Sequence, residues 1–158
     1  MAVRVAINGF GRIGRLTYRA LVESARDDIE VVGINDLGSA EANAHLLKYD
    51  SVHGVLLVDV SVSGDTMNAG RGDVKITSER EPSALPWADL GVDVVYECTG
   101  TFANRDKAAS HLDAGAKKVL VSAPASGADL TVVYGVNEDK LTSDHIVVSN
   151  ASCTTNCL

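Results

Sequence analysis

Short apolar segments alternate with amphipathic ones along the first part of the chain, and polar turns separate them. Positions 3–7 and 30–35 are mostly apolar and rich in β-branched residues, which is typical of strands buried in a parallel sheet. Ile13, Leu16 and Ala20 recur at helical spacing after the first of these segments. The order of strand, turn, helix and strand predicts an α/β fold.

The middle of the chain follows a different pattern. Apolar and polar residues alternate with a period of two at 58–63 and again at 74–77, on either side of a glycine-rich connection. This alternation predicts antiparallel strands with one polar face. The sequence therefore predicts a doubly wound, Rossmann-type domain with a mostly parallel sheet and a small antiparallel excursion.

The remaining elements follow from capping residues, turn residues and apolar runs. They are a helix that begins after Ser39, a loop at 49–54, a loop with Pro82, Pro86 and Trp87, a helix capped by Asn104 and ended by Gly115, and strands at 93–97, 117–121, 131–134 and 146–148. Together they predict a mixed sheet of about six or more strands.

The turn between the first strand and the first helix reads Asn8-Gly9-Phe10-Gly11-Arg12-Ile13-Gly14. Its G-x-G-x-x-G spacing suits a backbone that turns sharply, approaches a pyrophosphate and packs the helix on its strand. A helix N-terminus offers free N–H groups to phosphates. The motif alone is weak, because glycine-rich turns are common.

Asp36 strengthens this interpretation. It ends the second strand, 22 residues beyond Gly14, where a carboxylate can accept hydrogen bonds from both ribose hydroxyls. A 2′-phosphate would meet like-charge repulsion there, so NAD is preferred over NADP. The alternative role for Asp36 is to cap the helix that begins near Ser39. The strand, the turn and the spacing together favour the ribose contact.

Other polar residues are expected at the same edge of the sheet. Ligands of open α/β sheets bind beyond the carboxyl ends of the strands. The residues expected to converge on one crevice there are Asn8, Asp36, Thr99, Gly100 and Ser122.

Composition narrows the class of protein. The chain has 158 residues, 46% of them hydrophobic, and a net charge of -7, which predicts a globular domain and disfavours nucleic acid as a partner. Three cysteines suit a reducing compartment, and no apolar run is long enough to span a membrane. We therefore expect a cytoplasmic protein. Arg15 and Arg19 are expected on a solvated helix face.

Cys153 has the most suggestive setting of the three cysteines. The segment 149–157 follows a strand and is rich in helix-capping residues, which places Cys153 in the first turn of a helix. Unpaired N–H groups there favour a thiolate and can hold an oxyanion. Beside a nicotinamide, a thiolate can add to an aldehyde and give an adduct that loses hydride, so that a thioester forms.

The other cysteines and the histidines suggest less. Cys98 and Cys157 are expected to be inert, and two cysteines four residues apart do not complete a zinc site, so no metal is expected. The four histidines are interpreted as loop or surface residues without a catalytic role, and they are His45, His53, His111 and His145.

Six motifs in this order resemble the N-terminal half of the phosphorylating glyceraldehyde-3-phosphate dehydrogenases. They are INGFGRIGR at 7–15, NDL at 35–37, KYDSVHG at 48–54, ECTG at 97–100, SAPA at 122–125 and SNASCTTNC at 149–157. The resemblance implies an NAD-binding domain at 1–149 and the start of a catalytic domain at 150–158. It also implies a cytoplasmic homotetramer.

The resemblance implies roles for individual residues as well. Cys153 would form the thiohemiacetal with glyceraldehyde 3-phosphate, inorganic phosphate would release the thioester, and Ser152 and Thr154 would contact the substrate. The cofactor positions that it implies are Arg12, Ile13, Asp36, Arg80, through its backbone carbonyl, and Ser122. With the turn and the strand ends, the candidate NAD contacts are Asn8, Gly9, Phe10, Gly11, Arg12, Ile13, Asp36, Arg80, Thr99, Gly100 and Ser122.

The chain is shorter than members of that family, which continue with a histidine base, two anion sites and much of the tetramer interface. We therefore expect this polypeptide alone to bind NAD weakly at best and not to complete turnover. The alternatives are erythrose-4-phosphate dehydrogenase, a semialdehyde dehydrogenase and a non-catalytic nucleotide-binding module. The sequence SNASCTTNC fits a semialdehyde dehydrogenase less well.

Overall fold

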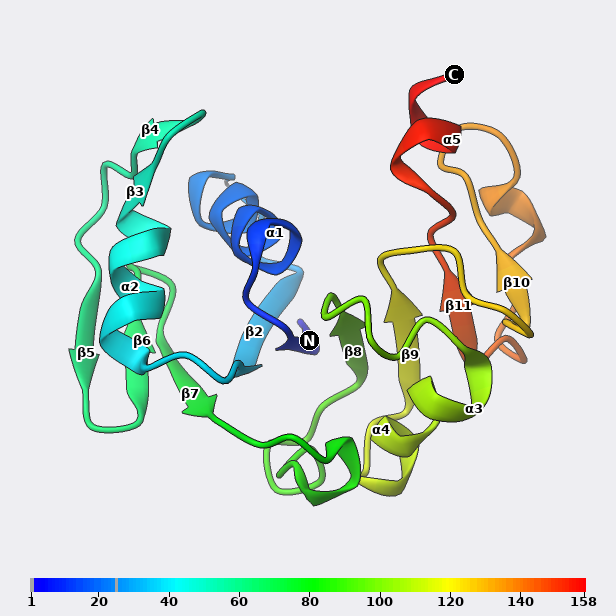
Figure 1. Cartoon of the computed structure of the whole chain (residues 1–158), viewed down its shortest axis with the longest axis horizontal. Helices are drawn as coiled ribbons and strands as arrows, with labels where there is room; N and C mark the ends of the chain where they lie inside the picture. Colours follow the sequence, from blue (N-terminus) through cyan, green and yellow to red (C-terminus); the bar gives the residue numbers. More distant parts are fainter. Residues whose placement is uncertain (1, 25) are drawn as a thin grey trace.

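The computed structural model describes residues 2–24 and 26–158. Within these residues, nine strands form one sheet, and β1 lies in its middle (Figure 1). In spatial order the strands are β10 (Leu130–Thr131), β11 (Val147–Ser149), β9 (Lys118–Val121), β8 (Val94–Glu97), β1 (Val3–Asn8), β2 (Ile29–Asn35), β7 (Asp73–Thr77), β6 (Thr66–Asn68) and β5 (Ser61–Ser63).

The sheet is mostly parallel. Every neighbouring pair from β10 across to β7 is parallel, whereas β6 pairs antiparallel with both β7 and β5. From β1 the chain adds β2 on one side and later β8 and β9 on the other, so its winding reverses between β1 and β8. The predicted fold class, with its antiparallel excursion, is confirmed.

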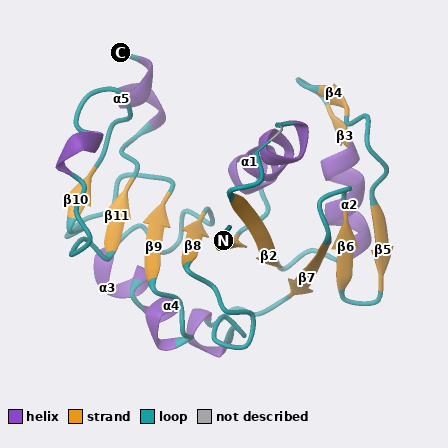
Figure 2. Cartoon of the chain, turned by 180° about the vertical axis from the view of Figure 1, so that it is seen from behind, coloured by secondary structure: helices purple, strands orange, loops and turns teal. Residues whose placement is uncertain are grey.

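Helices and loops cover both faces of this sheet (Figure 2). The helices are α1 (Arg12–Glu23), α2 (Ala40–Lys48), α3 (Arg105–Ala108), α4 (Ser110–Asp113) and α5 (Cys153–Cys157), with short 3-10 turns η1 (Pro82–Ala84) and η2 (Glu138–Lys140). One core lies between the sheet and α1 and α2, and two smaller cores lie around Trp87 and beneath α3 and α4.

The predicted caps are confirmed. The Ser39 side chain accepts from the N–H of Ala42 at 3.1 Å, and the Asn104 side chain accepts from the N–H of Asp106 at 3.0 Å. Each supplies a partner to a backbone donor that the first turn of a helix leaves free.

The small strands were the hardest to predict. The segment 49–54 was expected to be a loop. It instead belongs to a hairpin of two antiparallel strands, β3 (Tyr49–Asp50) and β4 (Gly54–Val55). The glycine-rich connection, where no strand was predicted, contains β6. The strand expected at 131–134 is shorter and begins one residue earlier, as β10 at Leu130–Thr131. These elements are two or three residues long, too short for a periodicity to be visible.

The buried face of helix α1 differs from the apolar positions that the sequence pattern predicted. Ile13 is 51% exposed, whereas Tyr18, Arg19 and Val22 are buried. Arg19 was expected on a solvated face, and this expectation is wrong. Its guanidinium donates to the carbonyls of His53 at 3.1 Å and Gly54 at 2.8 Å, which fastens the β3–β4 hairpin to α1.

None of the described helices is both long enough and apolar enough to cross a membrane.

Candidate dinucleotide site

The first glycine of the turn is required by the backbone. Gly9 has φ +91°, and a side chain added there would lie 2.7 Å from the backbone nitrogen of Thr99. Gly14 is required by packing, because a methyl group would lie 2.1 Å from the Gly9 carbonyl oxygen. Both glycines therefore hold the turn tightly against β8 and against its own helix.

Gly11 is different. Its φ of -69° suits any residue, and an added methyl group would meet no atom of residues 2–24 and 26–158 within 4 Å. Nothing in these residues explains the absence of a side chain at this position. The open space above Gly11 fits a ligand that approaches the backbone at the N-terminus of α1.

Asp36 is held by two backbone groups. Its Oδ2 accepts from the N–H of Phe10 at 2.8 Å, and its Oδ1 accepts from the N–H of Gly38 at 2.8 Å. The alternative role, a cap for α2, is filled by Ser39 instead. Each carboxylate oxygen of Asp36 retains a second lone pair for a ligand hydroxyl.

A cavity of about 440 Å³ opens at the carboxyl edge of the sheet, between β1, β2 and β8. It lies where the winding of the chain reverses, the usual ligand position in this architecture. The candidate residues that line it are Asn8, Gly9, Gly11, Asp36, Arg80 and Thr99. The lining residues that sequence reasoning did not name as cofactor contacts are Asn35, Leu37, Glu79, Cys98, Thr101 and Phe102.

The positions of those residues in the sequence could have indicated that they line the cavity. All of them except Phe102 lie directly beside a named candidate in the sequence, and Phe102 is two residues from Gly100. Whole segments at the strand ends, not single polar residues, therefore form the wall.

Five candidates lie outside the lining of this cavity. Phe10 is buried in the core, and Ile13 is exposed on α1. Arg12 extends away to Asp50, whose carboxylate it contacts at 2.5 Å. Gly100 follows Thr99 without lining the cavity, and the N–H of Ser122 donates to the carbonyl of Glu97 at 2.9 Å without lining the cavity either.

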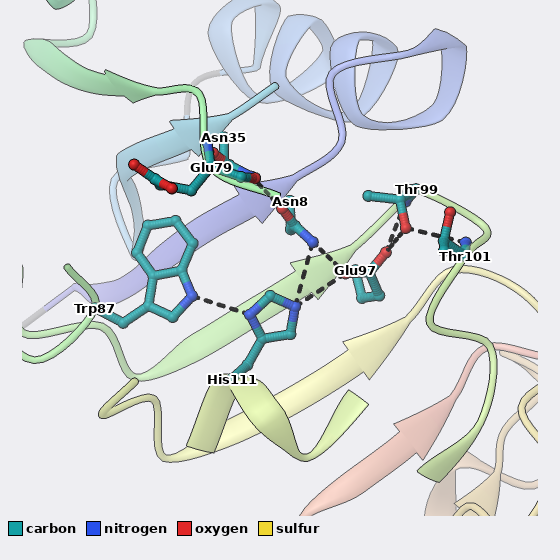
Figure 3. Close-up of polar contacts among 8 residues, drawn as sticks. All are labelled: Asn8, Asn35, Glu79, Trp87, Glu97, Thr99, Thr101 and His111. Atoms are coloured by element: carbon teal, nitrogen blue, oxygen red, sulfur yellow. Dashed lines mark hydrogen bonds and ion pairs between the residues drawn. The ribbon is translucent and has the colours of Figure 1, made fainter. Parts of the chain in front are cut away.

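A chain of buried polar side chains lies beneath the cavity (Figure 3). The Asn35 amide donates to Asn8 at 2.7 Å, and the Asn8 amide donates to Glu97 at 2.6 Å. Glu97 contacts His111 at 2.9 Å, and Trp87 donates to His111 at 3.0 Å. The interpretation of His111 as a loop or surface residue is therefore wrong, since it is 0% exposed.

Glu97 remains an anion in this setting. Burial raises the pKa of its carboxyl, but hydrogen bonds from His111, Thr99 and Asn8 outweigh burial and hold the pKa below its ordinary value. A buried carboxylate with a full set of donors is stable as a charge.

Cys153 begins α5, as its sequence context predicted. Ser152 caps the helix by accepting from the N–H of Thr155 at 3.0 Å, and its hydroxyl lies 3.1 Å from that of Thr154. Cys153 and Thr154 are exposed, and none of the three lines the cavity beneath the turn. Because β11 runs parallel to β9, α5 begins at the same carboxyl edge of the sheet as the cavity.

The turn before Cys153 is strained and well anchored. Ala151 has φ +57°, which is unusual for a residue with a side chain. Ser149, fully buried, donates to the carbonyl of Ala123 at 2.9 Å and accepts from the N–H of Ala151 at 3.2 Å. Sequence reasoning did not identify Ser149 as the anchor.

No group of three His, Cys, Asp or Glu side chains is placed to hold a metal ion within residues 2–24 and 26–158.

The parallel sheet, the glycine turn and the acidic residue at the end of β2 define a Rossmann-type dinucleotide-binding domain. Residues 3–105 match the family model described as "Glyceraldehyde 3-phosphate dehydrogenase, NAD binding domain". The chain belongs to this family.

Several curated proteins are similar to the whole chain. Glyceraldehyde-3-phosphate dehydrogenases from Xanthobacter flavus and Cereibacter sphaeroides are 67% and 63% identical over 158 residues, and one from Geobacillus stearothermophilus is 55% identical over 159. Each alignment covers 100% of this chain and 47% of the relative. The chain therefore spans about half the length of these relatives.

Proposed function

We propose that this chain is the NAD-binding half of a phosphorylating glyceraldehyde-3-phosphate dehydrogenase. The observation that carries the proposal is the open space above Gly11, at a position where neither φ nor packing requires a glycine. A dinucleotide whose pyrophosphate approaches the backbone explains that space.

The chain offers distinct groups to each part of the cofactor. The N–H groups of Gly11, Arg12 and Ile13, at the N-terminus of α1, face the pyrophosphate. The N–H groups of Gly9 and Phe10 donate to the carbonyl of Asn35 and to Asp36, so these two residues contribute through the shape of the turn. Asp36 accepts from the adenosine ribose hydroxyls and excludes a 2′-phosphate. The remaining contacts that we propose come from Asn8, Arg80, Thr99, Gly100 and Ser122.

Two of these residues have side chains whose polar groups are already engaged within the protein. Both polar groups of the Asn8 side chain are already engaged, with Asn35 and with Glu97, and Asn8 is 1% exposed. The Thr99 hydroxyl donates to Glu97 and accepts from the N–H of Thr101. Their contribution to the cofactor is therefore through the backbone and through the shape of the cavity wall.

Cys153 is the proposed nucleophile, with Ser152 and Thr154 as substrate contacts. Its thiolate adds to the aldehyde carbon of glyceraldehyde 3-phosphate, and the carbonyl oxygen takes up a proton. Bound NAD supplies the acceptor for the hydride in the oxidation. After the carbon has been oxidised to a thioester, an oxygen of inorganic phosphate attacks it, the carbon–sulfur bond breaks and Cys153 leaves as a thiolate.

We also propose the domain boundaries, the cellular location and the oligomeric state that the sequence implies. Residues 1–149 form the NAD-binding domain and 150–158 the start of the catalytic domain. The protein works in the cytoplasm, which suits three cysteines that are all free in this chain, and as a homotetramer.

Two experiments test the proposal. Isothermal titration of the chain with NAD and with NADP should give binding of NAD that is tighter by at least about tenfold, since NADP would place a phosphate against Asp36. Equal affinities would refute the ribose contact. NADH formation by the polypeptide as its organism makes it should require phosphate and should be faster with glyceraldehyde 3-phosphate than with erythrose 4-phosphate.

A further inference from the structure

His111 and Trp87 lie behind the wall of the candidate site, not in it. Both are 0% exposed, and neither lines the cavity. His111 comes from α4 on one face of the sheet, and its ring points toward the end of β8 (Figure 3). The proposed function gives these two buried residues no role.

The hydrogen bonds fix the tautomer of His111. The indole N–H of Trp87 can only donate, so Nδ1 of His111, at 3.0 Å, must be an unprotonated acceptor. The proton of the neutral ring is then on Nε2, which donates to Oε2 of Glu97 at 2.9 Å. Trp87 thus determines which ring nitrogen of His111 faces the carboxylate.

Glu97 uses both of its oxygens to connect structural elements. Oε2 accepts from His111 and from Asn8 of the glycine strand β1. Oε1 accepts from the N–H of Thr99 at 2.7 Å and from the Thr99 hydroxyl. The two residues beyond Glu97 are therefore held in one conformation by a single buried carboxylate.

The segment held in this way is the wall of the cavity. Thr99, Thr101 and Phe102 all line it. The Thr99 hydroxyl accepts from the N–H of Thr101 at 3.0 Å, which extends the fixed conformation along the segment. His111 also supports Phe102 directly, because their rings meet edge to face with centroids 6.3 Å apart.

We propose that His111 is a positioning residue for the dinucleotide site. Its Nε2–H, fixed by Trp87, orients the Glu97 carboxylate so that the wall from Thr99 to Phe102 is preformed before a ligand enters. The inference rests on the proposed function, since it assigns His111 to the same site. His111 touches no ligand and acts through Glu97 and Phe102.

The first test compares NAD affinities of three variants by isothermal titration. His111→Leu removes the donor to Glu97 and should weaken NAD binding by at least about tenfold. His111→Gln keeps an N–H donor and should stay within about threefold of the wild-type chain. Leu56→Ala, which removes a buried core side chain away from this network, should lower the melting temperature but leave the affinity unchanged.

The second test needs no variant. Trp87 is the one tryptophan of the sequence, so the ¹⁵N-labelled chain has a single indole N–H signal. Addition of NAD should shift this signal, although Trp87 does not line the cavity, because a ligand against the preformed wall polarises the hydrogen bonds that run from Thr99 through Glu97 and His111 to Trp87.

The outcomes separate the inference from the proposed function. If the wild-type chain does not bind NAD, both are overturned. If it binds NAD but His111→Leu binds equally well, the positioning role alone is overturned. If His111→Leu does not fold, the indole signal decides: an unmoved signal in the NAD-bound wild-type chain overturns the positioning role, and a shifted one supports it.

Discussion

The backbone N–H of Phe10 donates to the carboxylate of Asp36 at 2.8 Å, which joins the glycine turn after β1 to the end of β2. The two residues are 26 positions apart in the sequence. The turn that faces the pyrophosphate in our proposal therefore also orients the carboxylate that faces the ribose. A site with its groups already oriented loses less entropy when a ligand binds.

Asp36→Ala should weaken NAD binding by about 10- to 100-fold, because it removes two charge-assisted hydrogen bonds to the ribose. Binding of NADP should change less, so the preference for NAD should fall. Titration with both cofactors measures this ratio. Asp139→Ala, which removes an exposed carboxylate elsewhere on the surface, is the matched control, and an equal effect of both variants would contradict the ribose contact.

Gly11→Ala should leave the stability of the chain within about 0.5 kcal/mol of the wild type, because the added methyl group meets no atom of the described residues within 4 Å. The same change should weaken NAD binding by at least about tenfold, since the methyl group occupies the approach of the pyrophosphate. Urea denaturation and cofactor titration of the same preparation separate the two effects.

Gly14→Ala should have the opposite effect on stability and serves as the comparison for Gly11→Ala. Its methyl group would lie 2.1 Å from the Gly9 carbonyl oxygen, so α1 must move from its strand. We expect a loss of stability of about 2 kcal/mol or more. A stable Gly14→Ala chain together with an unstable Gly11→Ala chain would reverse the assigned roles of the two glycines.

The glycine turn was predictable because its constraints are local. The positive φ at Gly9, the open position at Gly11 and the close packing at Gly14 all follow from a spacing visible within seven residues. The parallel strands were predictable for the same reason, since Val, Ile and Ala run through their buried stretches. The two-residue strands β3, β4 and β10 have no such internal pattern.

Asp129 gives a test of acid stability. Hydrogen bonds from the N–H of Val147, the side chain of Arg105 and the N–H of Ile146 lower the pKa of its carboxyl to about 2. Its contribution to stability is complete above the unfolded pKa, near 3.8, and is lost as the pH falls toward 2. Asp129→Asn should cost about 1–2 kcal/mol at neutral pH, a value reduced for partial exposure.

Urea denaturation at several pH values measures this dependence. The difference in unfolding free energy between wild type and Asp129→Asn should shrink steadily between about pH 4 and pH 2, because the wild-type carboxyl becomes protonated there. The other acidic residues titrate in both proteins, so the difference isolates Asp129. A difference that does not change with pH would show that the carboxylate charge contributes nothing.

The cysteines should differ in their reactivity. Burial raises the pKa of the Cys98 thiol to about 12, the nearby charge of Glu97 acts in the same direction, and a hydrogen bond with Ser122 opposes them. At pH 8 only about one thiol in ten thousand is then a thiolate. Iodoacetamide should modify the exposed Cys153 and Cys157 in the folded chain and Cys98 only after denaturation, as peptide mass mapping would show. Modification of Cys98 in the folded chain would contradict the raised pKa of its half-buried thiol.

The buried polar chain could not be predicted from the sequence. Glu97 and Asn8 are 89 positions apart, and His111 and Asn8 are 103 apart, so no local pattern connects them. A lone histidine or a loop tryptophan gives no sign of its partner until the strands are ordered in space. Arg19 was misjudged for the same reason, because its partners are carbonyl groups of the β3–β4 hairpin.

The most direct test of the central claim is a titration of the ¹⁵N-labelled chain with NAD, followed at each backbone amide. The account predicts that the largest shifts occur at the lining of the cavity, above all at Gly9, Gly11, Asp36 and Thr99. It also predicts that Gly11→Ala requires at least about tenfold more NAD to produce these shifts. The structure has another cavity, whose lining includes Tyr18, Leu21 and Tyr96. Shifts confined to that cavity, or no shifts at all, would contradict a dinucleotide site at the glycine turn.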